Sequence, residues 1–136
     1  MIGKLHHIGI ATRDILTDVS FYGMFGYVAK ANLREDVDAG IKVQFLSADG
    51  QPDIELVQNI AKDGPMTPHL QAKRKIFHFA YESDDIKADA QKLIDERGAI
   101  WLVPITETDS AEMSAWCYLA FRNMMILELV QARRRS

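Results

Sequence analysis

Hydrophobic and polar residues alternate along several short stretches of this chain, as they do in half-buried β-strands. The clearest stretches are "LHHIGIA" at residues 5–11 and "IFHFAYE" at residues 76–82, which also contain β-branched or aromatic residues. Each is followed by apolar residues at helical spacing, which predicts a helix with one buried face. The expected buried residues are Ile15, Val19 and Tyr22 in the first helix, and Ile86, Ala90, Leu93 and Ile94 in the second. Asp14, and Asp84 or Asp85, are the expected N-caps, and Gly23, Gly26 and Gly98 the expected helix ends.

Three more strand-like stretches follow each helix. They cover residues 27–33, 41–48 and 53–58 after the first helix, and residues 99–105, 115–121 and 125–131 after the second. Residues 59–75 contain Gly64, Pro65 and Pro68, so they are expected to form a connector. The sequence therefore predicts the order βαβββ twice, which is an α+β fold class.

The two halves also repeat each other in sequence. "HHIGIATRDI" at residues 6–15 aligns without a gap with "FHFAYESDDI" at residues 77–86, so that His7 aligns with His78. Further along, "IELVQ" matches "LELVQ", so that Glu55 aligns with Glu128. The second match has a slightly larger offset than the first, which one loop can absorb. We therefore expect one domain over residues 1–136, built from repeat 1 (4–60) and repeat 2 (75–132).

Strand alternation assigns side chains to faces of the predicted sheets. Bulky apolar residues fall on one face, where the helices can pack, and a histidine or glutamate with small neighbours falls on the other. The polar residues on that second face are His7, Glu55, His78 and Glu128. Two imidazoles and two carboxylates suit a divalent transition metal, and the ion would offset the cost of burying the carboxylates.

Each of these residues also has an ordinary interpretation. A single strand histidine is more often a hydrogen-bonded core or surface residue than a metal ligand, and Glu55 alone could face solvent. The repeat favours the metal, because both ligand types recur at matching positions. His6 lacks this support, since its counterpart is Phe77, and it is interpreted as structural.

Composition narrows the functional class. Hydrophobic residues make up 48% of the chain, enough for a substantial core, and the net charge of −3 gives no electrostatic case for binding nucleic acid. Cys117 is the only cysteine, so no intramolecular disulfide can form, which fits a reducing compartment. The sequence contains no apolar run of membrane-spanning length and no signal-peptide block near the N-terminus. A soluble cytoplasmic protein is expected.

"HHIGIATRDI", "IELV", "FHFAYESDDI" and "LELV" together resemble the vicinal oxygen chelate superfamily, and the resemblance extends over nearly the whole chain. It implies two tandem βαβββ modules forming an incomplete barrel around a metal site, in a protein that is expected to be a homodimer. The implied metal ligands are His7, Glu55, His78 and Glu128. The ion could be Co, Ni, Zn or Mn, since all four accept nitrogen and oxygen ligands.

The full set of two histidines and two glutamates is similar to that of bacterial glyoxalase I and of many methylmalonyl-CoA epimerases. Extradiol dioxygenases, in contrast, have no carboxylate at the position of Glu55. The chemistry implied is removal of a proton next to a metal-chelated carbonyl or thioester, through an enediolate. Glu128 is the first candidate for the catalytic base and Glu55 the second.

The layout of residues 54–86 is similar to that of the epimerases, which makes an epimerase acting on an acyl-CoA the preferred prediction. The alternatives are a glyoxalase I-like lactoylglutathione lyase acting on a glutathione adduct, and a non-catalytic protein of the same fold that binds a small molecule.

Candidate substrate contacts are Gln44, beside the position where some epimerases carry a second glutamate, and the basic cluster Lys73, Arg74 and Lys75. The cluster could contact a CoA phosphate, although a solvated turn is the commoner role of such a run. The aromatic residues Trp101, Trp116 and Tyr118 could line the substrate mouth, although aromatic residues in strands more often simply pack. "ARRRS" at residues 132–136 is expected to be a flexible tail.

Overall fold

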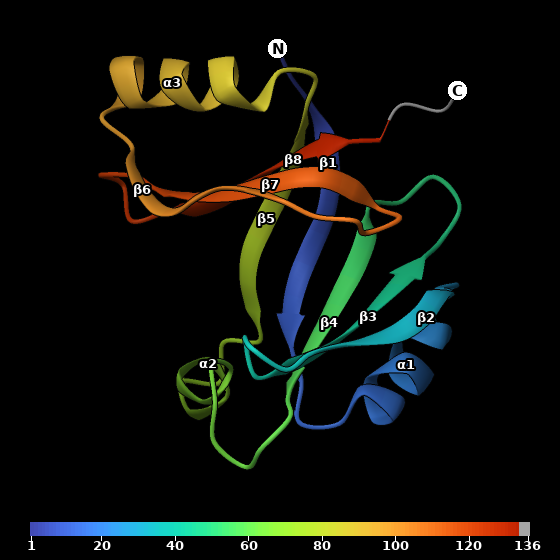
Figure 1. Ribbon diagram of the computed structural model, residues 1–136. Coiled ribbons are helices and arrows are strands. Elements are labelled where there is room, and N and C mark those ends of the chain that lie inside the picture. Colours follow the sequence, from blue (N-terminus) through green and yellow to red (C-terminus); the bar gives the residue numbers. More distant parts are fainter. Residues whose placement is uncertain (134–136) are drawn as a thin grey trace. The chain divides into compact units, whose positions relative to one another are not determined.

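The structure is a computed structural model that describes residues 1–133, and it contains both predicted βαβββ motifs (Figure 1). In the first half the elements are β1 (Ile2–Ala11), α1 (Ile15–Gly23), β2 (Val28–Asp36), β3 (Ile41–Ser47), β4 (Asp53–Asn59) and the short helix α2 (Thr67–Gln71). In the second half they are β5 (Ile76–Ser83), α3 (Ile86–Arg97), β6 (Ile100–Glu107), β7 (Met113–Ala120) and β8 (Ile126–Ala132). The α+β fold class is confirmed. None of the described helices is long and apolar enough to cross a membrane.

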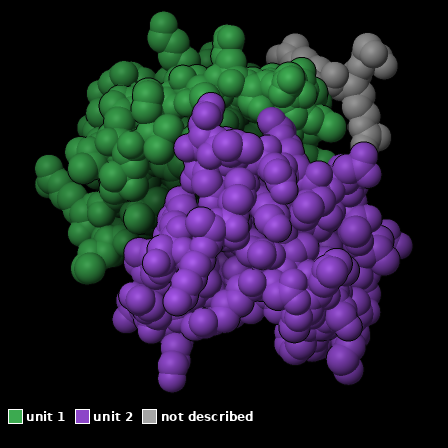
Figure 2. All heavy atoms as spheres, turned by 60° about the horizontal axis from the view of Figure 1, so that its bottom comes forward, with its two compact units in different colours: residues 1–6, 78–136 green, residues 7–77 purple. Residues whose placement is uncertain are grey.

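The chain divides into two compact units, which Figure 2 shows in different colours. One unit comprises residues 7–77, and the other comprises residues 1–6 together with residues 78–136. The boundary therefore falls inside β1, so that the first residues of this strand belong to the unit that contains the second repeat.

Within residues 7–77 the strands follow the order β2-β3-β4-β1. β1 runs parallel to β4, whereas the pairs β3/β4 and β2/β3 are antiparallel. The other unit has the same arrangement, with the order β6-β7-β8-β5. There β5 runs parallel to β8, and the pairs β7/β8 and β6/β7 are antiparallel.

The strand registers of the two units also agree. Gly9 lies opposite Glu55 in the β1/β4 pair, and Ala80, which is the counterpart of Gly9 in the repeat, lies opposite Glu128 in the β5/β8 pair. The sequence repeat is thus also a structural repeat, because equivalent residues lie opposite each other in the two units.

Each helix packs its predicted apolar stripe on the bulky face of its own sheet. Ile15, Val19 and Tyr22 of α1 contact a core cluster that includes Ile10, Leu46, Ile54 and Leu56. Ile86, Ala90, Leu93 and Ile94 of α3 contact a cluster that includes Cys117, Leu119 and Leu129. Burial of these side chains removes apolar area from water and stabilises each unit, and it leaves the opposite sheet face for the histidines and glutamates.

The helix ends follow the predicted signals. The Asp85 carboxylate accepts a hydrogen bond of 3.1 Å from the Ala88 backbone amide and so caps α3. Asp14 occupies the N-cap of α1, where its carboxylate accepts a hydrogen bond of 2.6 Å from the Thr17 hydroxyl. Gly98 ends α3 in the left-handed conformation, with φ of 65°, which a residue with a side chain rarely adopts.

The prediction of a flexible tail is wrong for its first two residues, Ala132 and Arg133. Ala132 is the last residue of β8, and the Arg133 guanidinium donates hydrogen bonds to the backbone carbonyls of Ser110, at 2.6 Å, and Thr108, at 2.9 Å. The remaining residues of that prediction, 134–136, lie outside the described part of the chain.

Candidate functional site

The unit of residues 7–77 contains a histidine and a glutamate on neighbouring parallel strands. His7 of β1 is fully buried, and its Nε2 atom lies 3.8 Å from Oε1 of Glu55 in β4, whose side chain is 15% exposed. Gly9, directly opposite Glu55, has no side chain, so the Glu55 carboxylate can extend toward His7, which precedes Gly9 on the same face of β1. Local strand register thus brings this pair together.

The unit of residues 1–6 and 78–136 repeats this arrangement. His78 of β5 is buried, and its Nε2 atom lies 3.9 Å from Oε2 of Glu128 in β8, whose side chain is 5% exposed. Ala80 lies opposite Glu128 and again provides only a small side chain. Each unit therefore carries one histidine–glutamate pair, and the glutamate is buried in the pair His78–Glu128 and partly buried in the pair His7–Glu55.

The distance within each pair suits two ligands of one metal ion. A direct hydrogen bond between imidazole and carboxylate would bring the two atoms to about 3 Å. Two ligand atoms, each about 2.0–2.2 Å from one ion, can be at most about 4.4 Å apart. The separations of 3.8 and 3.9 Å lie between these limits. Within residues 7–77, His7 and Glu55 carry donor atoms that could hold a metal ion.

An aromatic ring lies against each histidine, and sequence reasoning did not identify this feature. The rings of Phe45 and His7 are 5.3 Å apart with an interplanar angle of 90°, and those of Tyr118 and His78 are 5.3 Å apart with an angle of 87°. Edge-to-face contacts of this kind restrict the rotation of the imidazole. The available signal was the spacing, because Tyr118 follows Phe45 by the same offset as Glu128 follows Glu55.

The Glu128 carboxyl group has a strongly raised pKa. Burial raises its pKa from 4.5 to about 8, since the charged form loses hydration, and a hydrogen bond from the Tyr118 hydroxyl acts in the opposite direction. A bound cation would favour the charged form, because it supplies the opposite charge that the protein interior lacks.

Gln44, a candidate substrate contact, is held by backbone groups. Its side-chain amide donates hydrogen bonds to the carbonyls of Lys30, at 3.4 Å, Ala31, at 3.1 Å, and Phe45, at 3.1 Å. Ala31 has a φ of 64° and lies where the register between β2 and β3 shifts. In this structure Gln44 therefore stabilises an irregular edge strand.

The basic cluster is only partly available to a ligand. Lys73, Arg74 and Lys75 all follow α2 and are all exposed, but Lys75 also forms an ion pair with Asp18 of α1, with 2.6 Å between its Nζ and Oδ2. Asp18 is 8% exposed, so Lys75 supplies a positive charge to a mostly buried carboxylate. Lys73 and Arg74 remain predicted substrate contacts.

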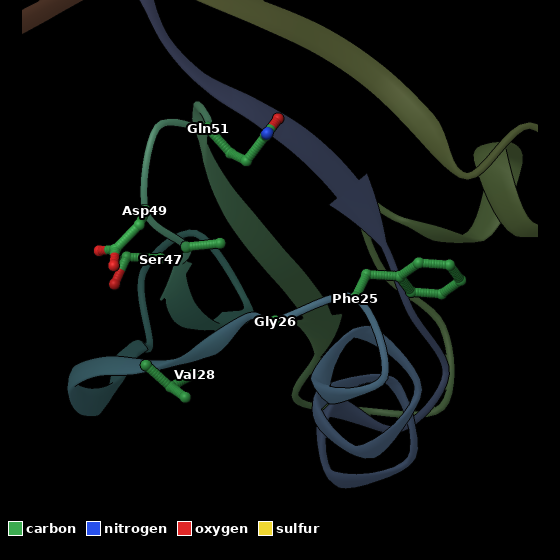
Figure 3. A pocket seen from close by; sticks show the side chains of 7 residues that line it. Phe25, Gly26, Val28, Ser47, Asp49 and Gln51 are labelled. Carbon is green, nitrogen blue, oxygen red and sulfur yellow. The ribbon is translucent and has the colours of Figure 1, made fainter.

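A separate hollow lies in the unit of residues 7–77, where the start of β2 meets the turn after β3 (Figure 3). Its lining residues are Phe25, Gly26, Val28, Ser47, Ala48, Asp49 and Gln51. None of the predicted metal ligands or substrate contacts is among them.

The family model of the glyoxalase/bleomycin resistance protein/dioxygenase superfamily matches residues 6–110. The chain belongs to this superfamily. The matched region contains His7, Glu55 and His78, and the suspected family is thereby confirmed. No curated protein sequence matches the chain significantly.

Solved structures share the superfamily fold at low sequence identity. A hypothetical protein from Bacillus halodurans C-125 has a TM-score of 0.82 and 21% identity, covering 98% of this chain and 96% of that one. Methylmalonyl-CoA epimerase from Mycobacterium tuberculosis has a TM-score of 0.78 and 18% identity, covering 96% and 88%. A variant of Streptomyces coelicolor methylmalonyl-CoA epimerase in complex with 2-nitronate-propionyl-CoA has a TM-score of 0.79 and 21% identity, covering 98% and 100%. At these identities the likeness concerns the fold.

Proposed function

We propose that this protein is a metal-dependent isomerase of the methylmalonyl-CoA epimerase type, which moves a proton on the carbon next to a thioester carbonyl. The observation that carries the proposal is the pair of matching sites, in which each repeat has a buried histidine beside a glutamate, with separations of 3.8 and 3.9 Å. Two independent core histidines would not be expected to acquire neighbouring glutamates at equivalent strand registers.

In this proposal His7, Glu55, His78 and Glu128 bind one divalent cation, with two ligands from each unit. Two carboxylates and two neutral imidazoles balance a charge of +2, which accounts for carboxylates on otherwise apolar strands. When bound, such an ion polarises a carbonyl oxygen and stabilises the negative charge that develops on it.

The protein's own residues would transfer the proton. A carboxylate within hydrogen-bond reach of the reacting carbon can accept its proton as a general base, and a second, protonated carboxyl group on the other side of that carbon can donate a proton to the opposite face. Glu128 and Glu55 are the two carboxylates proposed for these steps, and the apolar strands around them would exclude bulk water from the reacting carbon. Phe45 and Tyr118, at the edges of the two imidazoles, would keep His7 and His78 in fixed orientations.

The choice of an acyl-CoA substrate is supported by the epimerases among the solved structures and by the sequence layout between Glu55 and His78. The exposed Lys73 and Arg74 are proposed as contacts for the CoA phosphates. We further propose a cytoplasmic homodimer that forms one domain per chain and has no nucleic-acid partner. Sedimentation equilibrium of the purified protein would test its oligomeric state.

Deuterium incorporation tests the reaction. The metal-loaded protein is incubated with methylmalonyl-CoA in D2O, and mass spectrometry follows exchange of the proton next to the thioester. We expect exchange at a rate that falls at least about a hundredfold in Glu128→Gln, since loss of a general acid–base group typically costs a factor of about 10²–10⁴. Gln91→Ala is the matched control, because Gln91 is an exposed residue of α3.

A glyoxalase I-like lyase is the second candidate, favoured by the presence of a carboxylate at both repeat positions, Glu55 and Glu128. Turnover of methylglyoxal with glutathione, measured on the same protein sample, distinguishes the two. Activity on this substrate without deuterium exchange into methylmalonyl-CoA would replace the epimerase proposal with the lyase. A protein that binds the metal and reacts with neither substrate would exclude both activities while retaining the metal site.

A further inference from the structure

Phe45 and Tyr118 occupy equivalent places in the two repeats. In the antiparallel pairs β3/β4 and β7/β8, Phe45 lies opposite Glu55 and Tyr118 lies opposite Glu128. Each ring also meets the histidine of its own unit edge to face, at a centroid distance of 5.3 Å in both cases. The two aromatic residues therefore share one packing role, namely to restrain an imidazole.

The tyrosine hydroxyl is the chemical difference between these two positions. The Tyr118 hydroxyl donates a hydrogen bond to the Glu128 carboxylate, whereas a phenylalanine at position 45 has no group with which to do the same for Glu55. Hydrogen bonds to an ionised acceptor are the stronger kind, and the effect is larger where water is scarce. Glu128 is in such a place, since its side chain is 5% exposed compared with 15% for Glu55.

A carboxylate has two oxygen atoms and can therefore serve a tyrosine and a metal together. Oε2 of Glu128 is the atom 3.9 Å from His78 Nε2, on the side where the proposed ion would bind. A hydroxyl held on the same carboxylate fixes the plane of the group and hence the direction of its lone pairs. Outer contacts of this kind typically change metal affinity by a factor of about 10–100.

We infer that Tyr118 is a positioning residue whose hydroxyl orients the Glu128 carboxylate for the metal, so that the two glutamates of the repeat are not equivalent. The inference rests on the metal site of the proposed function. Tyr118 then has a role beyond packing. Its hydroxyl holds the Glu128 carboxylate in one orientation, and Phe45 cannot do this for Glu55 because it has no hydroxyl.

Cobalt(II) binding to the purified full chain tests this inference. Calorimetric titration gives the affinity, and the visible absorption bands of the bound ion report the geometry of its ligands. We expect Tyr118→Phe to weaken Co(II) binding about 10–100-fold and to shift these bands, since the ring remains while the hydroxyl is lost. Tyr81→Phe is the control, because Tyr81 lies in the same unit and packs in the α3 core cluster, on the opposite sheet face.

The outcomes separate the inference from the proposed function. Wild-type protein that binds no Co(II) would overturn both. Wild-type protein that binds Co(II), with unchanged affinity and spectrum in Tyr118→Phe, would overturn the inference and leave the metal site intact. Ultraviolet resonance Raman spectra of the unaltered protein give a second readout that does not depend on the variant folding. The tyrosine bands should change when Co(II) is added, and bands that stay constant would also overturn the inference.

Discussion

The Gln58 side chain, at the end of β4, accepts a hydrogen bond of 2.9 Å from the backbone amide of Ile15, the first residue of α1. The second repeat does the same, since Gln131 accepts a hydrogen bond of 3.0 Å from the Ile86 amide at the start of α3. The first amides of a helix have no partner within the helix. The final glutamine of "IELVQ" and "LELVQ" thus links the strand that carries the glutamate to the helix of the same unit.

Replacement of either glutamine should destabilise the protein, because a partly buried helix amide loses its acceptor. We expect Gln58→Leu and Gln131→Leu each to lower the free energy of unfolding by about 1–2 kcal/mol. Urea denaturation followed by circular dichroism measures the change. The control is Gln91→Leu on the exposed face of α3. It should stay within about 0.5 kcal/mol of wild type, as surface substitutions usually do. Equal stability of all three variants would contradict a linking role.

The raised pKa of Glu128, about 8 rather than 4.5, makes the stability of the metal-free protein depend on pH. The folded state binds this proton more tightly than the unfolded state, so the stabilisation is fully present below pH 4.5 and is lost as pH rises through 8. We expect the free energy of unfolding to fall by roughly 1 kcal/mol per pH unit across this window through Glu128.

The comparison with Glu128→Gln isolates this group, because the variant retains every other titrating residue. Urea denaturation of both proteins in a chelator, at a series of pH values, should give curves that converge at low pH and separate as the pH increases. Parallel curves would mean that Glu128 titrates normally.

Cys117 should be unreactive in the folded protein. Its side chain is fully buried, and burial raises the pKa of its thiol to about 11, so the nucleophilic thiolate is rare at neutral pH. We expect alkylation by iodoacetamide at pH 8 to be at least about a hundredfold slower in native protein than in urea, since fewer than about 1% of thiols would be ionised. Mass spectrometry of timed samples measures both rates, and similar rates would place Cys117 at the surface.

Lys75 should affect stability more than substrate binding, because Asp18 loses its partner when Lys75 is replaced. We expect Lys75→Met to lower the free energy of unfolding by roughly 1 kcal/mol or less, since solvent still reaches this ion pair. Lys73→Met, at an exposed position, should not change stability. If Lys75 instead contacts CoA, its replacement would raise the KM for an acyl-CoA substrate and leave the denaturation curve unchanged.

Much of the fold could be predicted because it is encoded locally and twice. Alternation separated the faces of β1 and β5, and the gapless alignment of His7 with His78 revealed the repeat. These two facts placed a histidine and a glutamate of each repeat on one face of its sheet. The parallel pairing of β1 with β4 and of β5 with β8, which brings the two side chains together, was not predicted.

The remaining contacts depend on tertiary structure that periodicity does not encode. Asp18 and Lys75 lie far apart in the sequence, and nothing in either local pattern indicates that they meet. The hydrogen bonds from the Gln44 amide to the carbonyls of Lys30 and Ala31, where Ala31 has a positive φ, were likewise not indicated by the local pattern. The roles of Gln58 and Gln131 were missed for another reason. Both glutamines recur in the repeated motif, but only the glutamates near them were interpreted as functional.

The unit boundary inside β1 has a consequence for how such a chain can be cut. Residues 1–6 belong with residues 78–136, so a gene fragment that encodes only the first repeat would also carry a strand segment without its neighbours. Exposed strand edges of this kind promote aggregation. Fragments separated after residue 77 should therefore be less soluble than a circular permutant in which residues 1–6 follow directly on the second repeat, even though each sequence repeat looks complete.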